Sequence, residues 1–329
     1  VVDGSQYLRR RPMERVVKPL KEMGAQMSYS QEHSCLPIMV KGQRKLRDLF
    51  YIQGVKSAQV KSSLLLAALK SGALLSLEEI GPTRNHLERM LSHLHVPIQW
   101  GEHSIKLPRG PHEVVAKNLS TPGDFSSAAA LMTAALLTPG SEIEINGLGI
   151  NPTRSSFLSL IERMGASIEK KNERLQCNEE VADLVLGYSG ALRAIEVKGD
   201  CCVKAIDELP LIAVLGAFAQ GKTIIRDAQE LRVKESDRLE TLTKGLKRLG
   251  FDLEDFEDGL EIRGKPKVLQ ALGQGRDRAL NIATSSDHRM VMALYIAAMS
   301  SGKRIELEDS DCLRDSYPSF FEDLEKLKK

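Results

Sequence analysis

The chain has 329 residues, of which 42% are apolar and 27% charged, a composition typical of globular proteins rather than of disordered or fibrous ones. Its net charge is only +2, and no long basic stripe is interleaved with aromatic residues, so we expect no nucleic-acid partner and only local anion sites. The five cysteines lack metal-ligand or redox spacing, which predicts reduced thiols and a cytoplasmic location, and no apolar run reaches the roughly 18 residues of a membrane span.

Four segments predict helices built from small and apolar residues, and each ends at a glycine, a common helix stop. In chain order they are 57–72, 124–140, 207–221 and 287–302. The first three are followed by a β-type run, a polar loop and a second helix. In these second helices Leu, Ile and Met recur at three- and four-residue spacing, which is typical of one buried face. Each second helix runs into a predicted hairpin, at 96–107, 166–177 and 251–262.

The repeating unit is therefore βαβαββ, with a strand expected ahead of each first helix. Residues 16–40 show only a second helix and a hairpin, so the chain holds one half repeat, three whole repeats and a final helix, strand and helix. Gly24, Gly165 and Gly250 occupy equivalent helix ends, and His95 takes that position in the second copy. We expect an α/β (α+β) fold in which these units pack into two globular domains.

Turn residues in "LSTPGD" predict the division between the domains near 119–123. We expect an incomplete first domain over 1–121, with the half repeat and one full repeat. A second domain over 122–329 would hold two full repeats and the final helix, strand and helix. Because the chain opens at Val1 with the pattern of the middle of a domain, we expect the N-terminal part of the fold to be missing.

The first helix of the second copy opens with polar residues at a loop-to-helix junction. Helix N-termini expose unpaired N–H groups and bind anions readily. "SAQVKS" places Ser57, the Ala58 amide and Gln59 there, and Arg84 follows on the loop before the next helix. On its own, this motif is explained as well by simple helix caps.

Three further clusters are strongly charged. "VKESDR" carries Lys234, Glu235 and Arg238. If this segment is helical, its two cations lie on one helix face, one turn apart, and repel each other unless an anion is bound between them. "SSDHRM" places a polar triplet, and "IDELP" a polar pair, directly before an apolar helix. Burying these polar groups costs free energy unless they border a cleft. Each cluster also fits a capping role, but together they favour a site. Arg suits bidentate binding of phosphate and carboxylate, and the acids suit proton transfer.

These motifs resemble those of the EPSP synthase family, the 3-phosphoshikimate 1-carboxyvinyltransferases. The matches run in order along the chain: "RRRPM", "SAQVKS", "PTRNHLERML", "PGDFSSAA", "NPTR", "IDELP", "ELRVKESDR" and "DHRM". The resemblance implies two domains of βαβαββ units, the enolpyruvyl transferase fold. It implies transfer of the enolpyruvyl group of phosphoenolpyruvate to the 5-hydroxyl of shikimate 3-phosphate, through a tetrahedral intermediate that loses phosphate. It implies no metal or organic cofactor, no membrane partner and a monomer.

The resemblance also assigns residues. Shikimate 3-phosphate would be bound by Ser57, Ala58, Gln59, Arg84, Asp207 and Lys234, and phosphoenolpyruvate by Arg11, Gln59, Arg238 and Arg289. Asp207 would take the hydroxyl proton, Glu235 would serve in proton transfer to the methylene carbon, and Lys234 would bridge both substrates. Glu208 and His288 are second choices.

Two departures keep other interpretations open. The family's Gly-Ser-Lys-Ser loop and its Gly-Asn-Ala/Ser-Gly-Thr loop are absent from these residues and would lie ahead of Val1. One alternative is therefore a truncated, non-catalytic fragment or binding module of this enzyme. A less favoured alternative is the sibling transferase acting on UDP-N-acetylglucosamine, because no cysteine sits in a loop that matches its reactive one.

Overall fold

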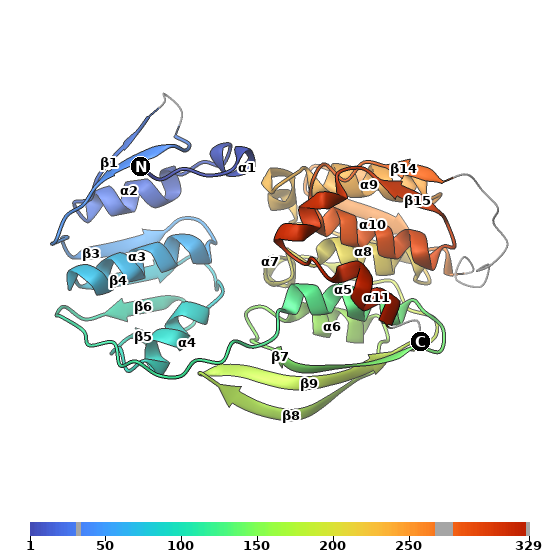
Figure 1. Cartoon of the computed structure of the whole chain (residues 1–329), viewed down its shortest axis with the longest axis horizontal. Helices are drawn as coiled ribbons and strands as arrows, with labels where there is room; N and C mark the ends of the chain where they lie inside the picture. Colours follow the sequence, from blue (N-terminus) through green and yellow to red (C-terminus); the bar gives the residue numbers. More distant parts are fainter. Residues whose placement is uncertain (31–33, 267–278, 327–329) are drawn as a thin grey trace. The chain divides into compact units, whose positions relative to one another are not determined.

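The computed structural model describes residues 1–30, 34–266 and 279–326 (Figure 1). The chain divides into two compact units. The first unit comprises Val1–Thr121 and Leu175–Glu179, and the second comprises Pro122–Arg174 and Glu180–Lys329. No helix in the described ranges is both long and apolar enough to cross a membrane.

The first unit contains a half repeat and a whole one. After the short α1 (Gln6–Arg9), helix α2 (Glu14–Glu22) leads into the antiparallel hairpin of β1 (Gln26–Tyr29) and β2 (Ile38–Lys41). A four-stranded sheet follows in the order β3-β4-β6-β5. Its strands are β3 (Leu49–Gln53), β4 (Leu75–Glu79), β5 (Gln99–Trp100) and β6 (Ser104–Leu107), with α3 (Ala58–Ser71) and α4 (His86–His93) in the connections. β3 and β4 pair in parallel, so α3 is the crossover helix between them.

The core of this unit lies between α3 and the sheet. Leu75 and Leu77 of β4 and Ile105 and Leu107 of β6 alternate along their strands and are buried, as expected for the inner face of a sheet. Buried α3 residues belong to the same core, with spacings of three and four: Val60, Leu64, Leu65 and Ala68. The first helix of the repeat is therefore anchored by its apolar face.

The second unit contains two whole repeats and the final elements. Its first repeat has α5 (Phe125–Leu136), β7 (Glu142–Gly149), α6 (Ser156–Arg163), β8 (Ile168–Gln176) and β9 (Glu179–Gly187). Its second has β10 (Glu196–Val197), α7 (Asp200–Lys204), α8 (Leu209–Phe218), β11 (Lys222–Ile225), η1 (Gln229–Val233), α9 (Arg238–Arg248), β12 (Asp252–Phe256) and β13 (Gly259–Arg263). The chain ends with β14 (Leu280–Ile282), α10 (His288–Ser300), β15 (Ile305–Leu307), η3 (Ser310–Asp315) and α11 (Phe320–Lys326).

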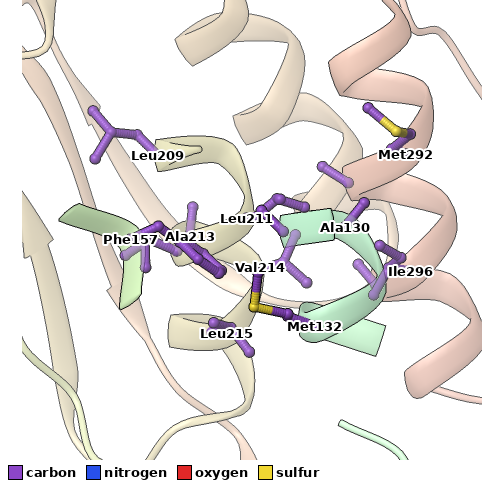
Figure 2. Packing of buried hydrophobic residues seen from close by; sticks show 14 of the residues in the cluster. Ala130, Met132, Phe157, Leu209, Leu211, Ala213, Val214, Leu215, Met292 and Ile296 are labelled. Atoms are coloured by element: carbon purple, nitrogen blue, oxygen red, sulfur yellow. The ribbon is translucent and has the colours of Figure 1, made fainter. Parts of the chain in front are cut away.

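Three apolar helices, α5, α8 and α10, contact one another in the centre of this unit. Every residue of α8 is buried, which explains why its sequence is apolar all round rather than on one face. Figure 2 shows Met132 of α5, Val214 of α8 and Ile296 of α10 among the side chains that fill the space between the helices. The N-terminal ends of α8 and α10 carry the charged motifs "IDELP" and "SSDHRM", whereas "VKESDR" leads into α9.

The predicted repeat is confirmed in outline, with two corrections in the first repeat of the second unit. Residues 166–177 form the single strand β8 rather than a whole hairpin, because the turn falls at Cys177 and Asn178, which have positive φ, and β9 follows it. Ahead of α5, where a strand is expected, the described residues form only an isolated bridge between Gly123 and Leu148.

The predicted helix ends are confirmed. Gly24, Gly165 and Gly250 have φ of 95°, 101° and 91°, and His95, which replaces glycine in the second copy, has φ of 62°. All four therefore take the left-handed conformation that ends many helices. The three glycines adopt this conformation without a steric penalty because they have no Cβ atom. His95 adopts it although its Cβ atom makes the left-handed conformation unfavourable.

Candidate active site

Arg238 is the first residue of α9 and the largest fully buried side chain of the second unit. Its Nε donates to Asp287 Oδ2 at 2.8 Å, and its Nη2 donates to Glu235. Nη1 lies 3.5 Å from Asp207 Oδ1 and has no hydrogen-bond partner in the part of the chain that the structure describes. Burial opposes the charge of Arg238, but the surrounding carboxylates, Asp287 first, outweigh it and raise the guanidinium pKa.

Asp287 is the N-cap of α10 and is completely buried. Its carboxylate accepts the Arg289 N–H at 2.9 Å and the Ser236 hydroxyl at 3.1 Å, in addition to Arg238. Burial favours the neutral acid, but the charge of Arg238 outweighs burial and holds the pKa of Asp287 below its usual value. Asp287 therefore joins the start of α9 to the start of α10.

One prediction for this region is wrong. Lys234 and Arg238 do not share a helix face, because α9 begins only at Arg238, and Lys234 caps the preceding short helix η1. The Asp237 carboxylate accepts the Glu240 N–H at 2.9 Å, and this cap sets the start of α9. Arg238 is balanced by carboxylates instead of being placed beside a second cation.

Asp207 and Glu208 are neighbours in sequence but occupy different environments. Glu208 is completely buried at the start of α8, where both of its oxygens accept hydrogen bonds from Arg154. Asp207 is partly exposed and lies between Arg238 and Arg289, whose Nη2 is 3.9 Å from Asp207 Oδ2. Asp207 is therefore the better placed of the two for proton transfer with a substrate, and Glu208 is an anchoring carboxylate.

Arg289 sits one residue inside α10 and faces the start of α8. Its Nη1 donates to Ser126 Oγ at 3.0 Å and to the Asp207 carbonyl at 3.2 Å, and it lies 3.4 Å from Glu208 Oε1. The Ser126 hydroxyl in turn donates to Glu208 at 2.8 Å. Three helix starts, those of α5, α8 and α10, thus converge on one polar cluster.

Two residues that sequence reasoning did not assign are central to this cluster. Arg154, on the turn before α6, and Ser126, in the first turn of α5, both contact Glu208. Burial opposes the charge of Arg154, but hydrogen bonding to Glu208 outweighs it and raises the guanidinium pKa. The only signal in the sequence was that both residues lie in ordered motifs, "NPTR" and "PGDFSSAA".

His288 lies in the cluster between Asp287 and Arg289 in sequence, and Lys234 precedes Arg238 by four residues. Burial, and then the nearby charge of Arg289, lower the pKa of His288 below its usual value. Lys234 is half-buried at the end of η1. Over the described ranges, no group of three or more His, Cys, Asp or Glu is arranged to hold a metal ion.

The other predicted residues lie in the first unit. Ser57 is the N-cap of α3, Ala58 and Gln59 form its first turn, and Arg84 is half-buried on the loop before α4. Ser57 makes no side-chain capping bond, so the simple cap explanation for this motif does not hold. Arg11 is half-buried after α1.

Chemically, the second-unit cluster offers guanidinium donors beside two carboxylates, Asp207 and Glu235. Such a set can bind an organic anion and move protons next to it. The arrangement fits a reaction in which an anionic substrate is protonated and deprotonated at neighbouring atoms.

The fold and this cluster define an enolpyruvyl transferase type of protein. The solved enolpyruvyl transferase NikO from Streptomyces tendae has the same fold, with a TM-score of 0.75 at 19% identity over 98% of this chain and 72% of that one. A solved EPSP synthase from Acinetobacter baumannii matches with a TM-score of 0.85 at 35% identity, over 99% of this chain and 72% of that one.

The family model for EPSP synthase (3-phosphoshikimate 1-carboxyvinyltransferase) matches residues 1–324, and the chain belongs to this family. A 3-phosphoshikimate 1-carboxyvinyltransferase of Geobacter metallireducens is 39% identical, over 99% of this chain and 73% of the relative. One of Streptococcus equi subsp. equi is 41% identical, over 98% of this chain and 73% of the relative.

Proposed function

We propose that the chain transfers the enolpyruvyl group of phosphoenolpyruvate to the 5-hydroxyl of shikimate 3-phosphate, with release of phosphate. The observation that carries the proposal is the buried Arg238, which is held by Asp287 and Glu235 and still has a hydrogen-bond donor, Nη1, without a partner among the described residues. A substrate carboxylate would take this donor, since paired and hydrogen-bonded anions are the favoured partners of a buried guanidinium.

Proton transfer is assigned to the two carboxylates beside Arg238. Asp207 accepts the proton of the 5-hydroxyl as the hydroxyl oxygen attacks C2 of phosphoenolpyruvate, and Glu235, carrying a proton, serves in delivering that proton to the C3 methylene. In the second half, the new methyl group returns one proton to Glu235 as the C2–O bond breaks and phosphate leaves. Asp207 lies beside Arg238 and Arg289, and Glu235 lies beside Arg238, so both carboxylates adjoin the proposed phosphoenolpyruvate site.

The substrate residues form two sets. Arg238 and Arg289 of the second unit, with Arg11 and Gln59 of the first, are proposed to bind phosphoenolpyruvate. Shikimate 3-phosphate is proposed to bind Ser57, Ala58, Gln59, Arg84, Asp207 and Lys234. The neutral donors at the start of α3 suit a phosphate group, because the helix N-terminus adds unpaired N–H groups.

The proposal also covers the domain boundaries, the oligomeric state and the location of the protein. We assign residues 1–121 to a first domain and 122–329 to a second, acting as a monomer in the cytoplasm. The five cysteines are all free, which is consistent with a reducing compartment.

Mass spectrometry of the reaction mixture tests the proposal. The purified chain is incubated with both substrates, and the expected product is shikimate 3-phosphate carrying one enolpyruvyl group. Formation of that product in the parent and its loss in Asp207→Asn would support the assignment; a parent chain that binds both substrates and forms no product would overturn it in favour of a binding module.

A further inference from the structure

A lysine is buried in the core of the first unit. Lys61 lies one turn into α3 and is 1% exposed, in the same buried stripe as Leu64 and Leu65. Its Nζ is 2.7 Å from Glu88 Oε1 and 3.2 Å from Glu79 Oε2, and both carboxylates are also buried. An ammonium group buried alone would cost several kcal/mol, so the two acids explain how the lysine is tolerated. They do not explain why it is there.

The contacts of Lys61 join three segments. Glu79 is the last residue of β4, and Glu88 lies in α4. The second oxygen of Glu79 accepts the Thr83 hydroxyl at 2.6 Å. Lys61, Glu79, Glu88 and Thr83 form what we call the Lys61 network. It connects the first turn of α3 to the end of β4, to the loop over 80–85 and to α4.

The same segments carry the first-unit residues of the proposed function. Ser57, Ala58 and Gln59 precede Lys61 by at most one helical turn, and the Ser57 carbonyl accepts the Lys61 N–H at 3.4 Å. Arg84 follows Thr83 directly. The Lys61 network therefore links the segments that carry these two groups of side chains.

A second set of contacts holds the turn before α3. The buried Gln53 side chain donates through Nε2 to the carbonyls of Val55, at 2.7 Å, and Ser57, at 3.0 Å. Lys56 packs so closely on Gly81 that a Cβ at this glycine would lie 2.6 Å from Lys56 Cε. The start of α3 and the loop over 80–85 are thus also in direct contact.

Stabilising the fold does not by itself explain the Lys61 network. A buried ion cluster stabilises a fold less than apolar side chains of the same volume commonly do. This one has two carboxylates for one ammonium, and Glu88 Oε2 is buried without a hydrogen-bond partner among the described residues. Directional contacts, in contrast, fix the distance and angle between elements in a way that apolar contacts do not.

We propose that Lys61, Glu79 and Glu88 are positioning residues that hold the start of α3 and the Arg84 loop at the spacing required to bind shikimate 3-phosphate. This inference rests on the proposed function. The network touches neither substrate; it acts through Ser57, Gln59 and Arg84.

The test measures binding of shikimate 3-phosphate to the whole chain by calorimetry, together with the melting temperature. The triple variant Lys61→Met/Glu79→Met/Glu88→Met replaces the buried ions with apolar side chains of similar volume, so it should melt at or above the parent's temperature. Its dissociation constant should rise about tenfold or more, because small misplacements of positioned groups cost that much. Thr83→Val removes only the hydroxyl that bonds Glu79 and should weaken binding in the same direction by a smaller factor.

Thr138→Val is the matched control, since that hydroxyl donates only to the Ala134 carbonyl within its own helix region, in the second unit. It should leave binding unchanged. If the parent binds and the triple variant binds within twofold of it, the inference is overturned while the proposed function stands. Binding that weakens only alongside a fall in melting temperature would mark a merely structural role and also overturn it. A parent chain that does not bind shikimate 3-phosphate would remove the proposed function, and the inference with it.

Discussion

Removing the guanidinium of Arg154 should destabilise the second unit strongly. Arg154→Met keeps most of the side-chain volume but leaves Glu208, which is 0% exposed, without its bidentate partner. Breaking a buried ion pair costs about 3–5 kcal/mol when one charge is left behind. Glu208 keeps the Ser126 hydroxyl at 2.8 Å and Arg289 at 3.4 Å, so we expect the lower end, about 3 kcal/mol.

For a unit of this size, that loss corresponds to a fall in melting temperature of about 6–12 °C, from 2–4 °C per kcal/mol. Circular dichroism during heating measures it. Lys222→Met is the matched control, because the Lys222–Glu261 pair has a similar distance, 2.7 Å, but its lysine side chain is 47% exposed. An exposed pair of this kind contributes at most about 1 kcal/mol.

The double variant Arg154→Met/Glu208→Gln removes both charges and should recover part of the loss, because no uncompensated ion remains. If Arg154→Met lowers the melting temperature no more than Lys222→Met does, the buried pair is not the anchor that its geometry indicates.

Three further outcomes are expected. Arg238→Ala should weaken phosphoenolpyruvate binding by about 2 kcal/mol or more, measured by calorimetry, since a buried charge partner is lost; unchanged affinity would remove Arg238 from the site. Asp207→Asn should spare binding of both substrates and lower turnover by about 100-fold or more, as for loss of a general base, whereas parental turnover would refute that role. The pKa of Asp287 is depressed, so its contribution to stability is present above the usual value of 3.8 and is lost as pH falls through the folded-state pKa. Melting temperatures between pH 5 and pH 3 should therefore fall less steeply in Asp287→Asn than in the parent, and equal slopes would contradict the pairing with Arg238.

Much of the fold could be predicted from the sequence because each copy of the repeat shows the same spacing of apolar residues. Apolar spacing of three and four, a glycine stop and a hairpin recur in each copy, and local patterns of this kind determine helices and strands directly. The left-handed helix end at His95 could be predicted only from its register with Gly24, Gly165 and Gly250, since a histidine gives no such signal by itself.

The error at Lys234 was avoidable on physical grounds. Asp237 followed three residues later by Glu240 is the pattern of a helix start, and it places the first turn of α9 at Arg238. The spacing of Lys234 and Arg238 suggests one continuous helix, but the Asp237 cap predicts a break before Arg238.

Other features depend on contacts that no local pattern contains. Arg154 and Glu208 are 54 residues apart and meet only because α5, α6 and α8 pack together. The position of Lys61 in the buried stripe of α3 could be predicted from spacing, but its partners, Glu79 and Glu88, come from a strand and another helix. Pairings of this kind arise from tertiary packing, so sequence reasoning can name the residues and not the contact.

The most direct test of the central claim is phosphate release by the purified chain, incubated with phosphoenolpyruvate with and without shikimate 3-phosphate. We expect steady release that depends on shikimate 3-phosphate and that falls in Asp207→Asn. A folded chain that releases no phosphate with both substrates present would contradict enolpyruvyl transfer by these residues.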